Sequence, residues 1–88
     1  MIDKSTIESV KNIPVEQVLS RFIKLDKKGV TYTGLCPFHD EKTPSFIVFP
    51  RRNNFHCFGC GAHGDAITFV QQHAGLSFTD AVEQIAKD

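Results

Sequence analysis

Cys36-Pro-Phe-His39 and, after seventeen intervening residues, Cys57-Phe-Gly-Cys60 decide the fold of this chain. In each pair two residues separate the potential metal ligands, so that one tight turn can direct both side chains at a single ion. Structural zinc sites usually hold the metal with four tetrahedral Cys or His ligands supplied by two such pairs. The sequence therefore predicts one structural Zn²⁺ bound by Cys36, His39, Cys57 and Cys60.

Two other uses of the cysteines fit the sequence less well. A disulfide framework normally has an even number of cysteines in a secreted chain, whereas this chain has three and shows no signal peptide. A redox-active pair at Cys57 and Cys60 is the second alternative, and the chain would then be a thiol oxidoreductase. That alternative leaves Cys36 and His39 without a role, so a metal site is the preferred interpretation.

The fourth ligand has competitors among the histidines. His56 and His63 flank the second pair, and either could replace His39. The matched spacing favours His39, and His56 points away from Cys57 if the two residues share a strand. We interpret His56, His63 and His73 as surface or packing residues.

Composition indicates a single small domain, which we place at residues 1–88. Domains of this size have a limited core and are commonly reinforced by a structural metal. No apolar run approaches the ~20 residues that span a bilayer. No targeting segment is visible, and thiolate ligands suit a reducing compartment, so we expect a soluble, cytoplasmic protein.

The net charge of zero hides an uneven distribution along the chain. Residues 21–56 carry seven basic and three acidic side chains, a local charge of +4. The remaining residues carry three basic and seven acidic side chains, a charge of −4. A basic segment around the metal ligands indicates an anionic partner.

Apolar periodicity and turn residues predict helices at both ends of the chain and strands between them. Helices are expected over about residues 4–21 and 65–87, and a sheet bearing the zinc over about 22–62. Asp65 is the expected N-cap of the first C-terminal helix, and Gly75 its end. The fold class is thus α+β, a small zinc-ribbon-like antiparallel sheet flanked by helices. Its strands are expected at residues 30–33, 45–49 and 54–58.

A longer match accompanies the ligand pairs. The stretch from Leu35 to Phe46, LCPFHDEKTPSF, together with FHCFGCG at 55–61 and Gly64-Asp65, closely resembles the zinc-binding domain of bacterial DNA primases, a CHC2-type zinc finger. The likeness extends over most of the chain, including the segment IPVEQV at 13–18. Matched loop and ligand residues over such a length are far more specific than a single Cys-x-x-Cys.

The resemblance implies a role in making RNA primers for DNA replication. In that family the zinc domain helps to recognise single-stranded DNA template, cooperates with a separate polymerase domain, and works alongside the replicative helicase. The family's catalytic carboxylates lie in the polymerase domain. We therefore expect no catalytic residues here and no polymerase activity from this chain alone. The chain is expected to be either an excised domain of a primase or a stand-alone DNA-binding protein of a mobile element.

Single-stranded nucleic acid is typically bound by basic side chains along the phosphates and by aromatic rings that stack on bases. The predicted sheet carries the rings of Tyr32, Phe46, Phe49, Phe55 and Phe58, and packing in the core is the alternative role for each phenylalanine. Tyr32 is the favoured stacking residue because its hydroxyl tolerates water. The candidate nucleic-acid-binding residues are Lys24, Lys27, Lys28, Tyr32, Lys42, Phe46, Arg51, Arg52 and Phe55.

A protein-docking ribbon that binds a primase polymerase domain or a helicase is the other class of function. An exposed apolar stripe on the last helix, formed by Phe78, Val82 and Ile85, would favour it. Four zinc ligands leave no open coordination position for a catalytic water, so the zinc is expected to be structural.

Overall fold

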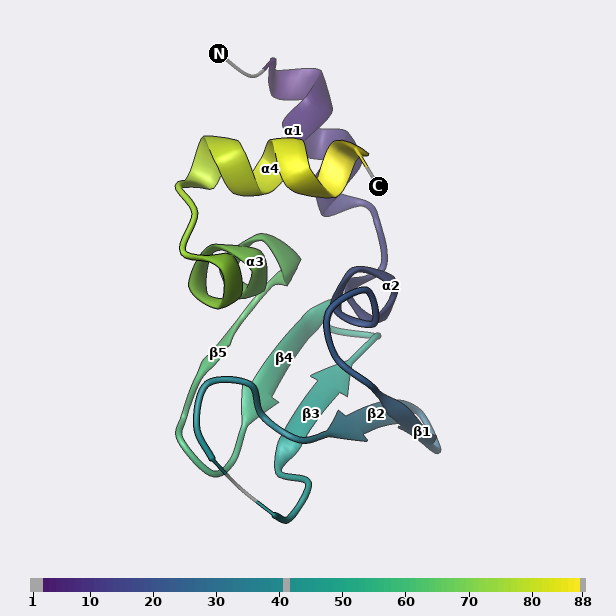
Figure 1. Cartoon of the computed structure of the whole chain (residues 1–88). Helices are drawn as coiled ribbons and strands as arrows, with labels where there is room; N and C mark the ends of the chain where they lie inside the picture. Colours follow the sequence, from purple (N-terminus) through teal and green to yellow (C-terminus); the bar gives the residue numbers. More distant parts are fainter. Residues whose placement is uncertain (1–2, 41, 88) are drawn as a thin grey trace.

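Four helices and five strands occupy the part of the chain that the computed structural model describes, residues 3–40 and 42–87 (Figure 1). The helices are α1 (Lys4–Lys11), α2 (Val15–Leu19), α3 (Ala66–Ala74) and α4 (Phe78–Lys87). The strands are β1 (Asp26–Lys28), β2 (Thr31–Gly34), β3 (Phe46–Phe49), β4 (Asn54–Cys57) and β5 (His63–Gly64).

The strands form one antiparallel sheet in the order β1-β2-β3-β4-β5. Because every strand pairs with the next along the chain, the turns alternate between the two ends of the sheet. The β1–β2 and β3–β4 turns lie at one end. The β2–β3 and β4–β5 connections, which carry the cysteines and His39, meet at the other end (Figure 1).

This architecture confirms the predicted α+β class: an antiparallel sheet that is preceded and followed by helices along the chain. The two edge strands were not predicted from the sequence. β1 consists of three charged residues and β5 of only two residues, His63 and Gly64, so neither has the apolar alternation that predicts a strand.

The sheet has one face against the helices and one face away from them. Along β3, Phe46 and Val48 are buried while Ile47 and Phe49 are partly exposed, as strand alternation predicts. Residues paired across antiparallel strands share a face, so the register extends this division to all five strands. We call the face away from the core the outer face. The register places on it Asp26, Lys28, Thr31, Thr33, Ile47, Phe49, Asn54, His56 and His63.

Helices α2 and α3 cover the inner face: α2 packs against β3, α3 against β5, and α4 crosses over α3 and α1 (Figure 1). The centre of the core is a cluster of phenylalanines. The ring centroids of Phe46 and Phe55 are 5.1 Å apart, and Phe69 of α3 lies 5.9 and 5.6 Å from them. Phe38, between the first two ligands, lies 5.4 Å from Phe69. The metal loop is thereby anchored in the core.

The C-terminal helices begin and end where their capping residues predict. The Asp65 carboxylate accepts a hydrogen bond of 2.8 Å from the Thr68 N–H, and Gly75 ends α3 in the left-handed conformation with φ 66°. The Ser77 hydroxyl accepts a hydrogen bond of 3.1 Å from the Asp80 N–H. Within residues 3–40 and 42–87, no helix is long and apolar enough to cross a membrane.

Asn53 ties the β3–β4 turn to the N-terminal helices. Its side-chain oxygen accepts a hydrogen bond of 2.9 Å from the Val15 N–H, at the start of α2. Its side-chain nitrogen donates to the Lys11 carbonyl, at the end of α1, over 3.2 Å. Pro14 precedes α2 and has no side-chain group that could cap it, so Asn53 supplies the cap from another part of the chain. Its φ of 55° is a left-handed conformation that asparagine tolerates better than most residues.

Replacement of Asn53 should therefore destabilise the domain. Asn53→Ala removes both hydrogen bonds. Alanine also tolerates a positive φ less well than asparagine does, so we expect a loss of about 1–3 kcal/mol in the free energy of unfolding. Asn53→Gly relieves the backbone strain alone and should cost less. Urea denaturation of the zinc-loaded chain measures both. Asn12→Ala, at an exposed asparagine, is the control; equal stability of the Asn53→Ala and Asn12→Ala variants would contradict the role of Asn53.

Candidate metal centre

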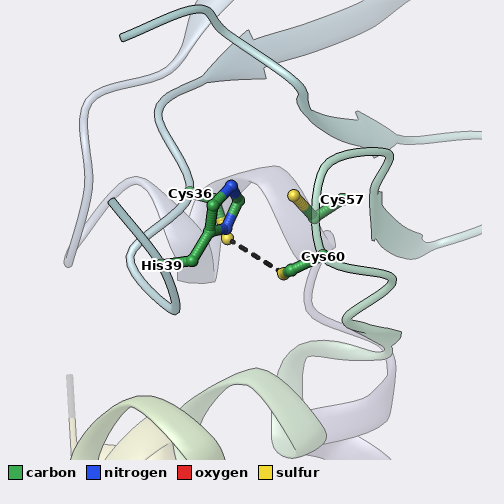
Figure 2. Close-up of side chains that lie close together, drawn as sticks. All are labelled: Cys36, His39, Cys57 and Cys60. Atoms are coloured by element: carbon green, nitrogen blue, oxygen red, sulfur yellow. Dashed lines mark hydrogen bonds between the residues drawn. The ribbon is translucent and has the colours of Figure 1, made fainter. Parts of the chain in front are cut away.

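Two loops bring the predicted ligands together at one end of the sheet (Figure 2). Cys36 and His39 come from the β2–β3 connection; Cys57 ends β4, and Cys60 follows it in the β4–β5 connection. The ligand atoms of these four residues all lie within 4.8 Å of one another. The side chains point toward a common centre from two segments that are far apart in sequence (Figure 2).

The spacing of the sulfur atoms fits one tetrahedral metal ion. The Cys36 and Cys60 Sγ atoms are 3.8 Å apart. Two thiolates bound at about 2.3 Å to the same tetrahedral zinc are separated by roughly 3.8 Å, whereas a disulfide brings its sulfurs to about 2.05 Å. Three soft sulfur donors and one imidazole favour zinc over magnesium or calcium. The donor set and its geometry therefore fit a closed structural zinc site.

Backbone N–H groups point at the sulfurs from within each loop. The Phe38 N–H donates to Cys36 Sγ, and the Gly59 N–H donates to Cys57 Sγ, both over 3.4 Å. The Ser45 hydroxyl lies 3.7 Å from Cys57 Sγ and can donate to it once that sulfur is a thiolate. These donors stabilise negative charge on sulfur, which is the form that binds metal.

The thiols differ in how readily they lose a proton. Burial raises the pKa of the Cys36 thiol to about 12. Burial acts in the same direction on Cys57, but hydrogen bonds from the Cys60 N–H, the Ser45 hydroxyl and the Gly59 N–H outweigh it and lower the pKa of Cys57 to about 7. Of these two thiols, Cys57 has the pKa nearer neutral pH. Because the bound ligands are thiolates, a metal that binds here must displace the proton of Cys36.

Gly59 is required by the close approach of the two loops. A Cβ atom at this position would lie 2.8 Å from His39 Nε2 and 2.8 Å from Ser45 Oγ. No side chain fits there unless the ligand histidine moves. The need for glycine arises from packing between the loops, which the sequence of one turn does not reveal.

The other histidines lie away from this cluster. His56 is on the outer face, where its ring centroid is 4.5 Å from that of Phe58 and 5.9 Å from that of His63. His63 is exposed and its Nδ1 lies 3.0 Å from the Gly61 carbonyl oxygen. His73 packs near Phe69 of the core, with ring centroids 5.3 Å apart. The structure places His39 alone among the histidines beside the cysteines.

The candidate basic residues gather mainly at the end of the sheet opposite the cysteines. Lys27 and Lys28 end β1, and Arg51 and Arg52 lie in the β3–β4 turn, which the antiparallel strand order places at the same end of the sheet. All are exposed, as are the other two candidates, Lys24 and Lys42. Arg52 lies over the Phe49 ring, with its guanidinium carbon 5.3 Å from the ring centroid.

Two of the candidate stacking residues, Phe46 and Phe55, lie inside the core. Phe46 is 0% and Phe55 1% exposed, and both belong to the core cluster, so neither ring can offer a face to a base. Tyr32 pairs with Val48 on the core side of the sheet and is half-buried against the core. Alternation predicts which residues share a face but not which face the helices cover, and this is why Phe46 and Phe55 were misassigned.

The rings that face outward are a different set. Phe58 is 67% exposed, directly after β4, and it contacts His56. Phe49 lies partly exposed on the outer face beneath Arg52. His56, His63 and Asn54 were not among the predicted nucleic-acid contacts, although the alternation of β4 with Phe55 in the core would have placed His56 and Asn54 outside.

The comparisons agree with the geometry of the site. The CHC2 zinc finger family matches residues 2–88. The chain therefore belongs to the CHC2 zinc fingers of bacterial DNA primases, and its likeness to this family is confirmed. The DNA primase of Chlamydia pneumoniae is 50% identical over 88 residues, and that of Thermotoga maritima 46% identical over 88 residues.

A solved structure has the same fold. The crystal structure of the Aquifex aeolicus primase, which contains zinc-binding and RNA polymerase domains, matches 98% of this chain with a TM-score of 0.87 and 40% identity. The match covers 21% of the Aquifex chain. The matches to the Chlamydia and Thermotoga proteins likewise span 99% of this chain. They span only 15% of the Chlamydia protein and 16% of the Thermotoga protein. It thus corresponds to the zinc-binding part of much longer primases.

Metal removal should disorganise the ligand loops and the strands joined to them. We expect a chelator to collapse the dispersed amide NMR resonances of residues 34–64, because metal binding energy is largely folding energy in a site of this kind. One equivalent of Zn²⁺ should restore the spectrum, and Mg²⁺ should not. An unchanged spectrum in the metal-free chain would show that the fold does not depend on the site.

Gly59→Ala should weaken metal binding with little direct effect elsewhere. The added methyl group displaces the His39 ring from its place beside the cysteines, so we expect a loss of at least tenfold in zinc affinity, measured by competition with a chromogenic chelator. Gly29→Ala is the matched control, because a Cβ there meets no atom within 4 Å although its φ of 63° is also unfavourable for alanine. Equal zinc affinity in the two variants would refute the packing argument.

Proposed function

We propose that this chain is the template-recognition module of a DNA primase: it binds one structural zinc through Cys36, His39, Cys57 and Cys60 and contacts single-stranded DNA with the outer face of its sheet. The observation that carries the proposal is the composition of that face. The exposed ring of Phe58 and the partly exposed ring of Phe49 lie along it, basic side chains stand at one of its ends, and the helices leave it uncovered.

The arrangement suits an unpaired strand. The phosphates would lie against Lys28, Arg51 and Arg52 at the turn end, where positive charge is concentrated. Bases would stack on Phe49 and Phe58 further along the face, since aromatic rings accept any base without regard to sequence. The small number of phosphate contacts predicts weak binding that is sensitive to salt.

Primer synthesis itself would belong to the rest of a primase. Relatives several times longer than this chain are DNA primases, and the Aquifex structure joins a zinc-binding domain to an RNA polymerase domain. We infer that the module presents template to such a polymerase domain, beside the replicative helicase, and has no catalytic residue of its own. Localisation in the cytoplasm follows from that role.

The docking alternative has less support. Val82 is 0% and Ile85 1% exposed on α4, and both pack into the core. Phe78 alone of the predicted apolar stripe is exposed, at 43%. The stripe that would have favoured a docking module is therefore an internal helix contact. The thiol oxidoreductase alternative is weakened by the four-ligand cluster, which engages both Cys57 and Cys60.

Titration of the zinc-loaded, isotope-labelled chain with single-stranded DNA at low salt tests the proposal. Amide NMR shifts should concentrate at Lys28, Phe49, Arg52, His56 and Phe58. Shifts confined to α1 and α4, or no shifts in a folded chain, would refute binding by the outer face.

Phe58→Ala should weaken this binding by about 1–3 kcal/mol through the loss of one stacking ring. Phe78→Ala removes an exposed phenylalanine from α4 and serves as the matched control. It should leave the affinity unchanged, and an equal loss in both variants would contradict the assignment of Phe58.

A further inference from the structure

Two histidines outside the cysteine cluster are neighbours on the outer face of the sheet. His56 of β4 and His63 of β5 are direct partners in the antiparallel register. The Cys57 N–H donates to the Ala62 carbonyl over 2.7 Å, so backbone hydrogen bonds flank the histidine pair instead of joining it. Side chains approach each other most closely at such positions of an antiparallel ladder. The sheet therefore holds two imidazoles side by side on a fixed backbone.

The two rings are close to the spacing that one shared ion requires. Their centroids are 5.9 Å apart, and their planes differ by 24°. Two imidazoles that bind one ion through ring nitrogens at about 2.1 Å have ring centroids roughly 4.5–5.5 Å apart. His63 is exposed and His56 is partly exposed. A small rotation about the side-chain bonds is therefore enough to bring both rings onto one ion.

The hydrogen bond of His63 leaves its other ring nitrogen available to a metal. Nδ1 lies 3.0 Å from the Gly61 carbonyl oxygen, which can only accept, so Nδ1 carries the hydrogen. Nε2 is then the unprotonated nitrogen of the neutral ring. Metal-binding histidines usually donate their other ring N–H to a carboxylate, a backbone carbonyl or water. His63 already has this arrangement.

His56 has no protein group that competes with a metal for its ring nitrogens. Among the residues that the structure describes, neither nitrogen makes a hydrogen bond to another protein group. The ring is positioned by its neighbours instead, with centroids 4.5 Å from Phe58 and 5.9 Å from His63. A nitrogen of His56 can therefore complete a two-histidine clamp.

The pair opens onto a hollow of about 580 Å³, which has room for an ion and its water ligands. Arg52 and Asp65 line the same hollow, and their opposite charges offset each other. Imidazole ligands suit zinc, copper, iron and nickel, whereas magnesium and calcium prefer oxygen ligands. The donor pair therefore selects a first-row transition-metal ion.

We propose that His56 and His63 form a second metal site, which binds one divalent transition-metal ion such as Zn²⁺ in exchange with solution. It differs in kind from the cysteine cluster. Two neutral nitrogen donors bind zinc less tightly than three thiolates and an imidazole, and two protein ligands leave coordination positions for water. The site does not depend on the proposed binding of DNA, and an ion held there adds positive charge to the same face.

The test uses the isotope-labelled chain loaded with one equivalent of Zn²⁺. Further Zn²⁺ is added while the imidazole nitrogens are followed by long-range ¹H–¹⁵N NMR; use of the same metal avoids exchange at the cysteine cluster. His63 Nε2 and one ring nitrogen of His56 should shift together along a single saturable curve, while the ring nitrogens of His73 stay in place. The same concentration of Mg²⁺ should shift none of them.

Replacement of either ligand should weaken the affinity for the second Zn²⁺ by about tenfold or more, because the second contact is intramolecular once the first has formed. The test variants are His56→Asn and His63→Asn. His73→Asn, at another exposed histidine, is the control and should keep the affinity. If His56→Asn fails to fold, His63→Asn carries the test, since His63 is exposed on a two-residue edge strand.

Three results would overturn the site. The first is the absence of shifts at both histidines up to millimolar Zn²⁺. The second is a shift of His63 whose affinity is unchanged in His56→Asn, since each ring would then bind an ion by itself. The third is an equal shift with Mg²⁺, which would show only a general attraction of cations to the surface. None of these results bears on the proposed DNA binding, which the oligonucleotide titration tests separately.

Discussion

The convergence of two short loops on one metal position is the constraint on which the rest of the structure depends. The loops carry Cys36 and Cys60, whose sulfurs are 3.8 Å apart although the residues are distant in sequence. Their junction fixes the spacing of β3 and β4, and Phe38 carries the same constraint into the phenylalanine core through its contact with Phe69. A domain with so small a core gains from the metal what larger domains gain from apolar burial.

The antiparallel topology keeps the metal end and the basic end of the sheet apart, and the proposed function gives the two ends separate roles. Ligand loops occupy one end, and the turns that carry Lys28, Arg51 and Arg52 occupy the other. Thiolates that would bind a cation are therefore remote from the side chains that are proposed to attract an anionic strand. The bases of such a strand would lie between, on the rings of the outer face. One compact sheet thus accommodates two opposite electrostatic requirements.

The ligand set and the fold class could be predicted because both depend on local spacing. Cysteine pairs, turn residues and strand alternation act over a few residues, so the sequence reveals them directly. Phe46 and Phe55 were misassigned because coverage of a sheet face by helices is a tertiary property. The packing role of Gly59 was missed for a related reason. It comes from a neighbour on another segment, the His39 ring.

Asn53 has a consequence for the thermodynamics of recognition. Its hydrogen bonds to Val15 and Lys11 hold the turn between β3 and β4 against the helices, while the metal loops hold the opposite end of the same strands. The hairpin that would receive the DNA is thus pinned at both ends before any ligand arrives. Little conformational entropy of the hairpin would then be lost on binding, so the entropic cost of the weak, salt-sensitive contact proposed above would be small.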